Sequence, residues 1–196
     1  MKIKKIIFIL IIYFFSLNKL YSIEPEIFVQ STVNRASTIL SLDKTKEEKI
    51  SELKAIANET VDIRGIGFYT LGSARKNLSE NEKNEYIVLF KQYFLKSFSS
   101  RLAEYTNPEI EVEGKKVLNE NYTIVNSLLK GTKERPEIKI DWRIYTKNSN
   151  NPLIRDLIIE GLSLARTQKE EFQSILNSND GDINSLFEIL REFSKN

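Results

Sequence analysis

The stretch SENEKNEYIVLFKQYFLKSFSSRLAEY, residues 79–105, decides the fold, because the sequence marks both ends of one long helix. Ser79 and Glu82 form an S-x-x-E capping box, in which each side chain binds a backbone NH that the first helical turn leaves unpaired. An Asn-Pro dipeptide follows the stretch, and the residue before a proline avoids helical backbone angles, so the helix is expected to end near Tyr105. About 26 residues at 1.5 Å each predict a rod of roughly 39 Å.

The apolar residues of this helix recur at the spacing i, i+3, i+4, i+7, which places them on one face. They are Tyr86, Leu89, Phe90, Tyr93, Phe94, Phe98, Leu102 and Tyr105. A stripe of this kind normally packs into a hydrophobic core. Because most of its members are aromatic and the helix is longer than a sheet cover requires, part of the stripe is also a candidate cavity wall for an apolar ligand.

Three helices are expected before the long one. The first covers residues 24–41, with Pro25 in its first turn. The second opens at a capping box formed by Thr45 and Glu48. The third covers residues 62–71 and should end at a glycine that follows it directly.

After the long helix the apolar period changes from 3.6 to 2, which indicates strands. Four are expected: one around residues 110–112, then residues 122–129, 137–146 and 153–159. Trp142 shares the dry face of its strand with Ile138, Ile140 and Ile144. Short turns between strands predict an antiparallel four-stranded meander, and helices return at residues 163–177 and after residue 182. The expected class is α+β, with helices packed on one face of the sheet around an apolar cavity.

The first 22 residues have the composition of a secretory signal peptide. Lysines precede an unbroken apolar run at residues 6–15, and Ser22 gives a small residue at a cleavage site. Ten apolar residues are too few for a bilayer core, which needs about 20. The expected product is a soluble, exported monomer, residues 23–196, forming a single domain.

Composition excludes several kinds of function. The chain has no Cys and no His, which removes disulfides, imidazole catalysis and the usual zinc sites. The signal segment contains four lysines and no acidic residue, so the rest of the chain has 25 basic and 27 acidic residues. This balance does not indicate a strongly basic surface for nucleic acid. A hydrolase that uses two carboxylates remains open. Glu109, Glu111 and Glu113 are the candidates, although their spacing also fits the wet face of a strand.

Three segments, in this order, resemble MlaC-type periplasmic phospholipid-binding proteins, also called the toluene-tolerance or ABC-transporter auxiliary family. The long helix has the F-x-x-Y-[FL] core, Phe90-x-x-Tyr93-Phe94, and it follows a Leu-Gly pair. The strand RPEIKIDWRIYTKN contains the hydrophobic-Asp-aromatic core, and LIIEGLSLARTQKEEFQSIL contains the E-G-[VL]-S-[LM] turn into a helix. The closing GDINSLFEIL is similar to the family's last helix, so the resemblance covers most of residues 60–190. Two patterns differ, with Ser-Ala-Arg in place of an aromatic pair after Leu-Gly and Thr-Gln-Lys in place of Asn-Tyr-Arg.

The resemblance implies a fold like that of nuclear-transport-factor and cystatin relatives, with acyl chains held between sheet and helices. It implies no enzyme activity, metal or cofactor, with phospholipid as the bound ligand. The lipid-contacting residues expected from the resemblance and the stripe are Phe90, Phe94, Phe98, Leu102, Ile140, Trp142, Ile144 and Leu162.

The resemblance also implies a task in the periplasm, which is to shuttle phospholipid between an outer-membrane lipoprotein complex and an inner-membrane ABC transporter. Such transport would maintain the lipid asymmetry of the outer membrane. Nucleic acid is not an expected partner. The alternative is a periplasmic small-ligand binder or adaptor with an ordinary filled core, which would keep no lipid through purification.

Overall fold

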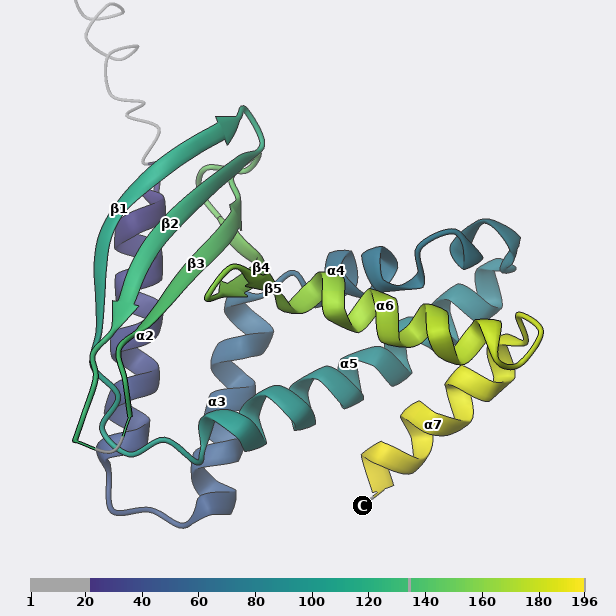
Figure 1. The fold of residues 1–196 in the computed structure, drawn as a ribbon, viewed down its shortest axis with the longest axis horizontal. Helices are drawn as coiled ribbons and strands as arrows, with labels where there is room; N and C mark the ends of the chain where they lie inside the picture. The colour runs from purple at the N-terminus through teal and green to yellow at the C-terminus, as the bar shows by residue number, and fades with distance from the viewer. Residues whose placement is uncertain (1–21, 134, 196) are drawn as a thin grey trace, which may run out of the picture.

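The computed structural model describes residues 22–133 and 135–195, so the signal segment expected at residues 1–22 lies almost wholly outside the described residues (Figure 1). The elements in chain order are α2 Pro25–Ser41, α3 Lys46–Thr60, α4 Ile63–Leu71, the 3-10 helix η1 Ala74–Asn77, α5 Glu80–Leu102, β1 Ile110–Asn119, β2 Tyr122–Leu129, β3 Ile138–Tyr145, β4 Leu153–Ile159, β5 Leu162–Ser163, α6 Leu164–Asn177 and α7 Ile183–Lys195. The expected α+β class and the order helices, meander, helices are confirmed.

Both predicted capping boxes are present. The Ser79 hydroxyl and backbone NH donate to the Glu82 carboxylate at 2.6 and 2.7 Å, and these two hydrogen bonds lower the pKa of Glu82. The Glu82 backbone NH donates back to the Ser79 hydroxyl oxygen. Thr45 and Glu48 make the equivalent pair at the start of α3. Local side-chain chemistry therefore fixes where these two helices begin.

The end of α5 was predicted about one turn too late. The helix ends at Leu102, and the Tyr105 NH donates to the Leu102 carbonyl at 3.0 Å, an i to i+3 bond that tightens the last turn. Asn107 then has a positive φ of 46° and turns the chain toward β1. Tyr105 still packs against the core from this turn.

The sheet is an antiparallel meander in the order β1-β2-β3-β4-β5. Its fifth strand was not predicted, because β5 has only two residues and no period can be read from them. It is formed by a two-residue hairpin in which Glu160 and Gly161 have positive φ values of 49° and 82°, the pattern of a type I′ turn. At the other end of β4, Val61 pairs with Ile154 in a parallel bridge and attaches the start of α4 to the sheet.

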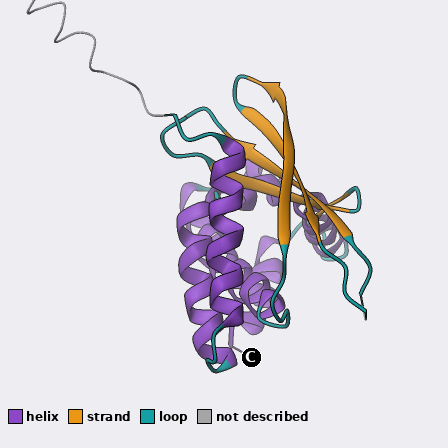
Figure 2. Cartoon of the chain, turned by 90° about the vertical axis from the view of Figure 1, so that its left-hand side faces the viewer, coloured by secondary structure: helices purple, strands orange, loops and turns teal. Residues whose placement is uncertain are grey.

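In Figure 2, α2 and α3 stand together on one side of the sheet, and α4 and α6 contact the sheet at β4. Trp142 stands opposite Val125 of β2 and Leu157 of β4, so these three residues share the inner face, and the predicted parity of β3 is confirmed. In Figure 1, α5 runs from the group α4, α6 and α7 toward α3 and the sheet.

The aromatic stripe begins in the closed core at Tyr86 and reaches the edge of a cavity at Phe90. Tyr86 and Phe90 are almost fully buried, and the Tyr86 ring lies 6.4 Å from the Phe187 ring of α7 and 6.5 Å from the Phe172 ring of α6. The Tyr86 hydroxyl is 2.7 Å from the Thr70 hydroxyl, and burial raises the pKa of Tyr86. From residue 93 onward the side chains of the stripe are only partly buried, which leaves that half available for a cavity.

Candidate functional site

Two cavities lie between the second half of α5 and the inner face of the sheet. The larger, about 270 Å³, is bounded by α5, α6 and the sheet, and we call it the α6 chamber. The smaller, about 160 Å³, is bounded by α2, α3, the end of α5 and the sheet, and we call it the α2–α3 chamber. Seven residues line both: Val61, Phe98, Arg101, Trp142, Ile154, Leu157 and Leu164. We call the two adjoining chambers together the slot, whose volume is of the size common for ligand pockets, about 300–1,000 Å³.

The lining of the α2–α3 chamber is almost wholly apolar. Its hydroxyl groups already donate to backbone carbonyls: Thr32 and Thr60 each bind the carbonyl four residues earlier at 2.8 Å, and Ser37 binds the Pro108 carbonyl at 2.9 Å. Because a satisfied hydroxyl offers a ligand little hydrogen bonding, this chamber suits hydrocarbon.

Aromatic rings separate and wall the two chambers. The Phe94 and Phe98 rings stack with centroids 5.4 Å apart and an interplanar angle of 10°. Across the slot the Trp142 indole NH donates to the Ser127 hydroxyl oxygen at 2.8 Å, and that hydroxyl donates to the Ile140 carbonyl at 3.0 Å. The polar atom of the indole is thus satisfied inside the sheet, which leaves the ring as apolar surface.

The rim of the slot is polar. Arg101 is exposed, lines both chambers and, within residues 22–133 and 135–195, has no carboxylate within ion-pair distance. Leu164 is also on both linings and 38% exposed, which marks the mouth. Over the α6 chamber the Tyr93 hydroxyl donates to the side-chain carbonyl of Gln168 at 2.8 Å and connects α5 to α6. Burial raises the pKa of Tyr93, and the carboxylate of Glu171 adds to that effect.

The structure brings six of the eight expected lipid-contacting residues to the slot: Phe90 and Phe94 in the α6 chamber, Leu102 and Ile140 in the α2–α3 chamber, Phe98 and Trp142 in both. Ile144 is fully buried in the core and lies outside both linings. Leu162 is 60% exposed on β5, also outside both linings. The alternation along a strand predicts which face of the sheet a residue lies on, but it does not predict how far along the strand a cavity extends.

Several lining residues were not identified from the sequence. Ile154 and Leu157 come from β4, where a register shift next to Arg155 obscures the alternation. Arg101 lies three residues after Phe98 and therefore on the aromatic face, so helical spacing could have found it. Because the side chain is charged, the apolar pattern of the helix does not include it.

Carboxylates in and near the slot have structural partners. Asp156 lines the α6 chamber, but its two oxygens accept from the Ser163 hydroxyl at 2.6 Å and from the Ala165 backbone NH at 3.0 Å, which caps α6. Glu109 and Glu111 are exposed and pair with Lys130 outside the slot. Glu171 also lines the α6 chamber, and its carboxylate accepts from the Gln168 side-chain amide at 2.9 Å. The two carboxylates of this chamber are therefore both engaged, whereas a carboxylate hydrolase requires two free ones facing one cleft.

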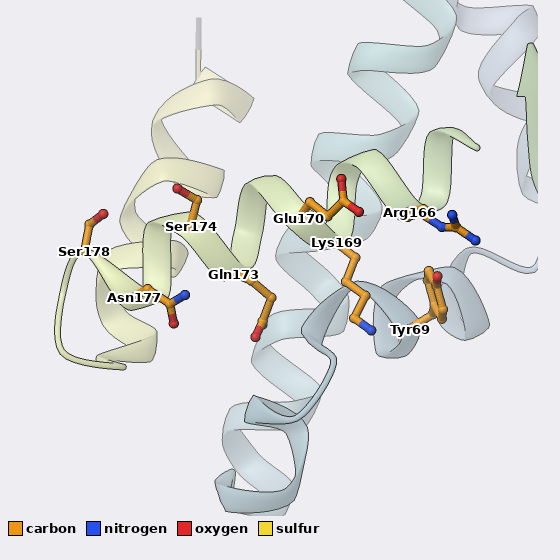
Figure 3. Close-up of a pocket in the computed structure, with 8 residues that line it drawn as sticks. All are labelled: Tyr69, Arg166, Lys169, Glu170, Gln173, Ser174, Asn177 and Ser178. Carbon is orange, nitrogen blue, oxygen red and sulfur yellow. The ribbon is translucent and has the colours of Figure 1, made fainter. Parts of the chain in front are cut away.

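A second hollow, about 650 Å³, lies on the other side of α6 (Figure 3). It has a larger volume than either chamber, but it is open to solvent and mostly polar, with Tyr69 of α4 and the exposed face of α6 as its walls. We take the slot as the candidate functional site, because only its lining suits an apolar ligand.

Within the described part of the chain, no cluster of three or more His, Cys, Asp or Glu side chains could hold a metal ion. Among the helices of residues 22–133 and 135–195, none combines the length and apolar character needed to cross a bilayer.

Comparison with known proteins agrees with this architecture. The family model described as MlaC protein matches residues 30–192. No curated protein matches the chain. A solved structure of a phospholipid-binding protein from Ralstonia solanacearum, in complex with a phospholipid, is similar with a TM-score of 0.73 and 16% sequence identity, covering 88% of this chain and 98% of that one. At this identity the likeness concerns the fold alone.

Proposed function

The chain belongs to the MlaC family, and we propose that it carries a diacyl phospholipid whose acyl chains occupy the slot. The observation that carries the proposal is the pair of apolar chambers that meet at Phe98 and Trp142. The α5 segment from Phe90 to Leu102 measures about 18 Å at 1.5 Å per residue. One acyl chain spans about half a bilayer core, ~15 Å, so this wall has the length of one chain.

The slot has two chambers, of about 270 and 160 Å³, and each takes only part of a ~16-carbon chain, so the slot must widen when both chains enter. Phe98 lines both chambers, and we assign one acyl chain to each chamber. Moving an acyl chain into water costs about 0.8 kcal/mol of free energy per CH₂. For two chains of ~16 carbons, unaided release from a membrane therefore costs on the order of 25 kcal/mol. A protein that keeps both chains dry removes most of this cost.

We place the lipid phosphate at the rim, beside Arg101. Its guanidinium has no carboxylate partner in the described residues and lines both chambers, so it can bind a phosphate while the chains descend on either side of Phe98. The planar guanidinium matches phosphate geometry with two parallel hydrogen bonds.

The task that fits such a carrier is the shuttling of phospholipid across the periplasm. We propose that it exchanges lipid with an outer-membrane lipoprotein complex and an inner-membrane ABC transporter, and thereby maintains outer-membrane lipid asymmetry. Family membership and the signal-like composition of residues 1–22 support this role.

The proposal is tested by purifying the protein from phospholipid-rich cells, extracting it with solvent and identifying the lipid by mass spectrometry. We expect about one diacyl phospholipid per folded protein. A folded protein that retains no lipid would favour the alternative, a small-ligand binder or adaptor with a filled core.

A further inference from the structure

The two chambers of the slot differ in the charged groups that line them. Arg101 is the charged residue in the lining of the α2–α3 chamber. The α6 chamber shares Arg101, but it adds the carboxylates of Asp156 and Glu171 and the amide of Gln168. The α6 chamber therefore presents charges of both signs beside apolar surface. A few polar groups placed beside an apolar wall are the feature by which ligand pockets orient and select a ligand.

The two carboxylates of the α6 chamber differ in how much they can still bind. Asp156 is buried, and its oxygens already accept from two groups at the start of α6. Glu171 is exposed and accepts from the Gln168 amide at 2.9 Å. Within the part of the chain that the structure describes, it has no Lys or Arg within ion-pair distance. Because an ionised carboxylate has about four acceptor positions, Glu171 can also accept from a ligand.

A chain of hydrogen bonds holds the Glu171 carboxylate in position. The Tyr93 hydroxyl donates to the Gln168 side-chain carbonyl at 2.8 Å, and the Gln168 amide donates in turn to Glu171. The Tyr93 ring is itself held between two others, with centroids 4.7 Å from the Phe193 ring and 5.9 Å from the Phe172 ring. The carboxylate is therefore placed before a ligand arrives, which lowers the entropic cost of binding.

Arg101 supplies the opposite charge from the facing helix. Side chains of a helix lean toward its N-terminus, so Arg101 leans back along α5 in the direction of Tyr93. Burial raises the pKa of Tyr93, the Glu171 carboxylate raises it further and the Arg101 guanidinium lowers it, so both charges act on the same hydroxyl. Arg101 and Glu171 nevertheless lie beyond ion-pair distance of each other. The chamber thus holds a cation and an anion with a gap between them.

We propose that Arg101 and Glu171 together select a phospholipid whose headgroup carries an ammonium beyond its phosphate. This inference rests on the proposed carrier function, in which the phosphate lies beside Arg101. An ethanolamine headgroup then places its ammonium, which has three N–H donors, toward the Glu171 carboxylate. A glycerol headgroup has no positive charge and leaves Glu171 without a partner. Complementary charges of this kind contribute more to specificity than to affinity.

The test loads the delipidated full exported protein from vesicles that contain equal parts of phosphatidylethanolamine and phosphatidylglycerol, and it quantifies each bound lipid by mass spectrometry. Glu171→Gln removes the charge and keeps an oxygen that can accept from Gln168. The matched control is Glu170→Gln, the same change at the neighbouring residue, which lines the hollow on the other side of α6 (Figure 3). Both glutamates are exposed, so both variants should fold.

An ion pair between exposed groups changes an equilibrium constant by up to about fivefold. We therefore expect the unchanged protein and Glu170→Gln to hold about three times more phosphatidylethanolamine than phosphatidylglycerol. Glu171→Gln should hold the two lipids in about equal amounts, and Glu171→Lys should favour phosphatidylglycerol. The preference of the unchanged protein should shrink at 1 M salt, where the Debye length is ~3 Å.

Equal amounts of the two lipids in the unchanged protein would overturn this inference and leave the carrier proposal intact. A preference that survives Glu171→Gln would also overturn it, and so would an equal loss of preference in Glu170→Gln, since net charge would then explain the result. Total bound phospholipid should stay near one per protein in all variants. A folded, unchanged protein that takes up neither lipid would instead refute the carrier proposal, and this inference with it.

Discussion

Replacing Phe98 by aspartate separates a lipid-lining residue from a core residue on the same helix. Phe98 is only partly buried, between the two chambers, and the new carboxylate would lie three residues before Arg101 on the same face of α5. It can reach water at the rim, so we expect a loss of about 1 kcal/mol in folding free energy, or roughly 2–4 °C in Tm.

The same carboxylate would lie against the acyl chains of a bound phospholipid. Contact between an ionised group and hydrocarbon costs at least about 3 kcal/mol, which corresponds to a loss of about a hundredfold in affinity. We therefore expect Phe98→Asp to purify folded and nearly free of lipid.

Two variants on α5 provide the comparison. Val88→Asp makes the same chemical change at a position that is 57% exposed, and it should alter neither Tm nor lipid content. Tyr86→Asp, at a position outside both linings, buries a charge among Phe90, Phe172 and Phe187, which costs several kcal/mol and lowers Tm by on the order of 10 °C or more.

The assay is differential scanning fluorimetry on each variant together with lipid quantification by mass spectrometry. Full lipid occupancy in Phe98→Asp would refute the assignment of this residue to the slot. A Tm as low as that of Tyr86→Asp, with lipid lost through unfolding, would assign Phe98 to the core.

Three further predictions concern the rim, the core and the N-terminus. Arg101→Gln should lower phospholipid retention by about tenfold, because a charged hydrogen bond to phosphate contributes about 1.5 kcal/mol or more. The control Lys91→Gln, at an exposed position on the same helix, should leave phospholipid retention unchanged. Equal retention in the two variants would show that Arg101 does not bind the phosphate. Stability should fall above about pH 10, because burial favours the neutral phenol of Tyr86, and a group with a raised folded-state pKa stabilises the fold below its ordinary pKa of ~10 and loses that contribution as pH rises. Tyr86→Phe should weaken this alkaline loss in Tm measurements, and an unchanged pH profile would contradict the assignment. Intact mass spectrometry and size-exclusion chromatography of exported material should give a monomer beginning at or near Ile23, whereas retention of residues 2–22 would contradict the signal assignment.

Those parts of the fold that depend on neighbouring residues in the sequence could be predicted. The capping boxes at Thr45 and Ser79 and the parity of Trp142 follow from side chains within a few residues of each other. The early end of α5 and the two-residue β5 could not, because both depend on single backbone bonds and turns with no periodic signal.

The division of the aromatic stripe between core and slot depends on distant segments. Tyr86 resembles Phe90, Phe94 and Phe98 in the sequence, but the rings of Phe172 and Phe187 close over it, whereas the other three line the slot. Helical spacing gives one face for all four residues, and only the packing of α6 and α7 decides which of them line a cavity.

The central claim, that acyl chains lie in the slot, is tested most directly by the fluorescence of Trp142, the only tryptophan of the chain. Its indole lines both chambers and is 7% exposed, so a chain in either chamber lies close to it. Loading the protein with phospholipid that carries brominated acyl chains should quench its emission strongly, and removal of the lipid should shift the emission. Unquenched and unshifted emission, in a protein shown by mass spectrometry to hold the brominated lipid, would contradict the account and place the chains elsewhere.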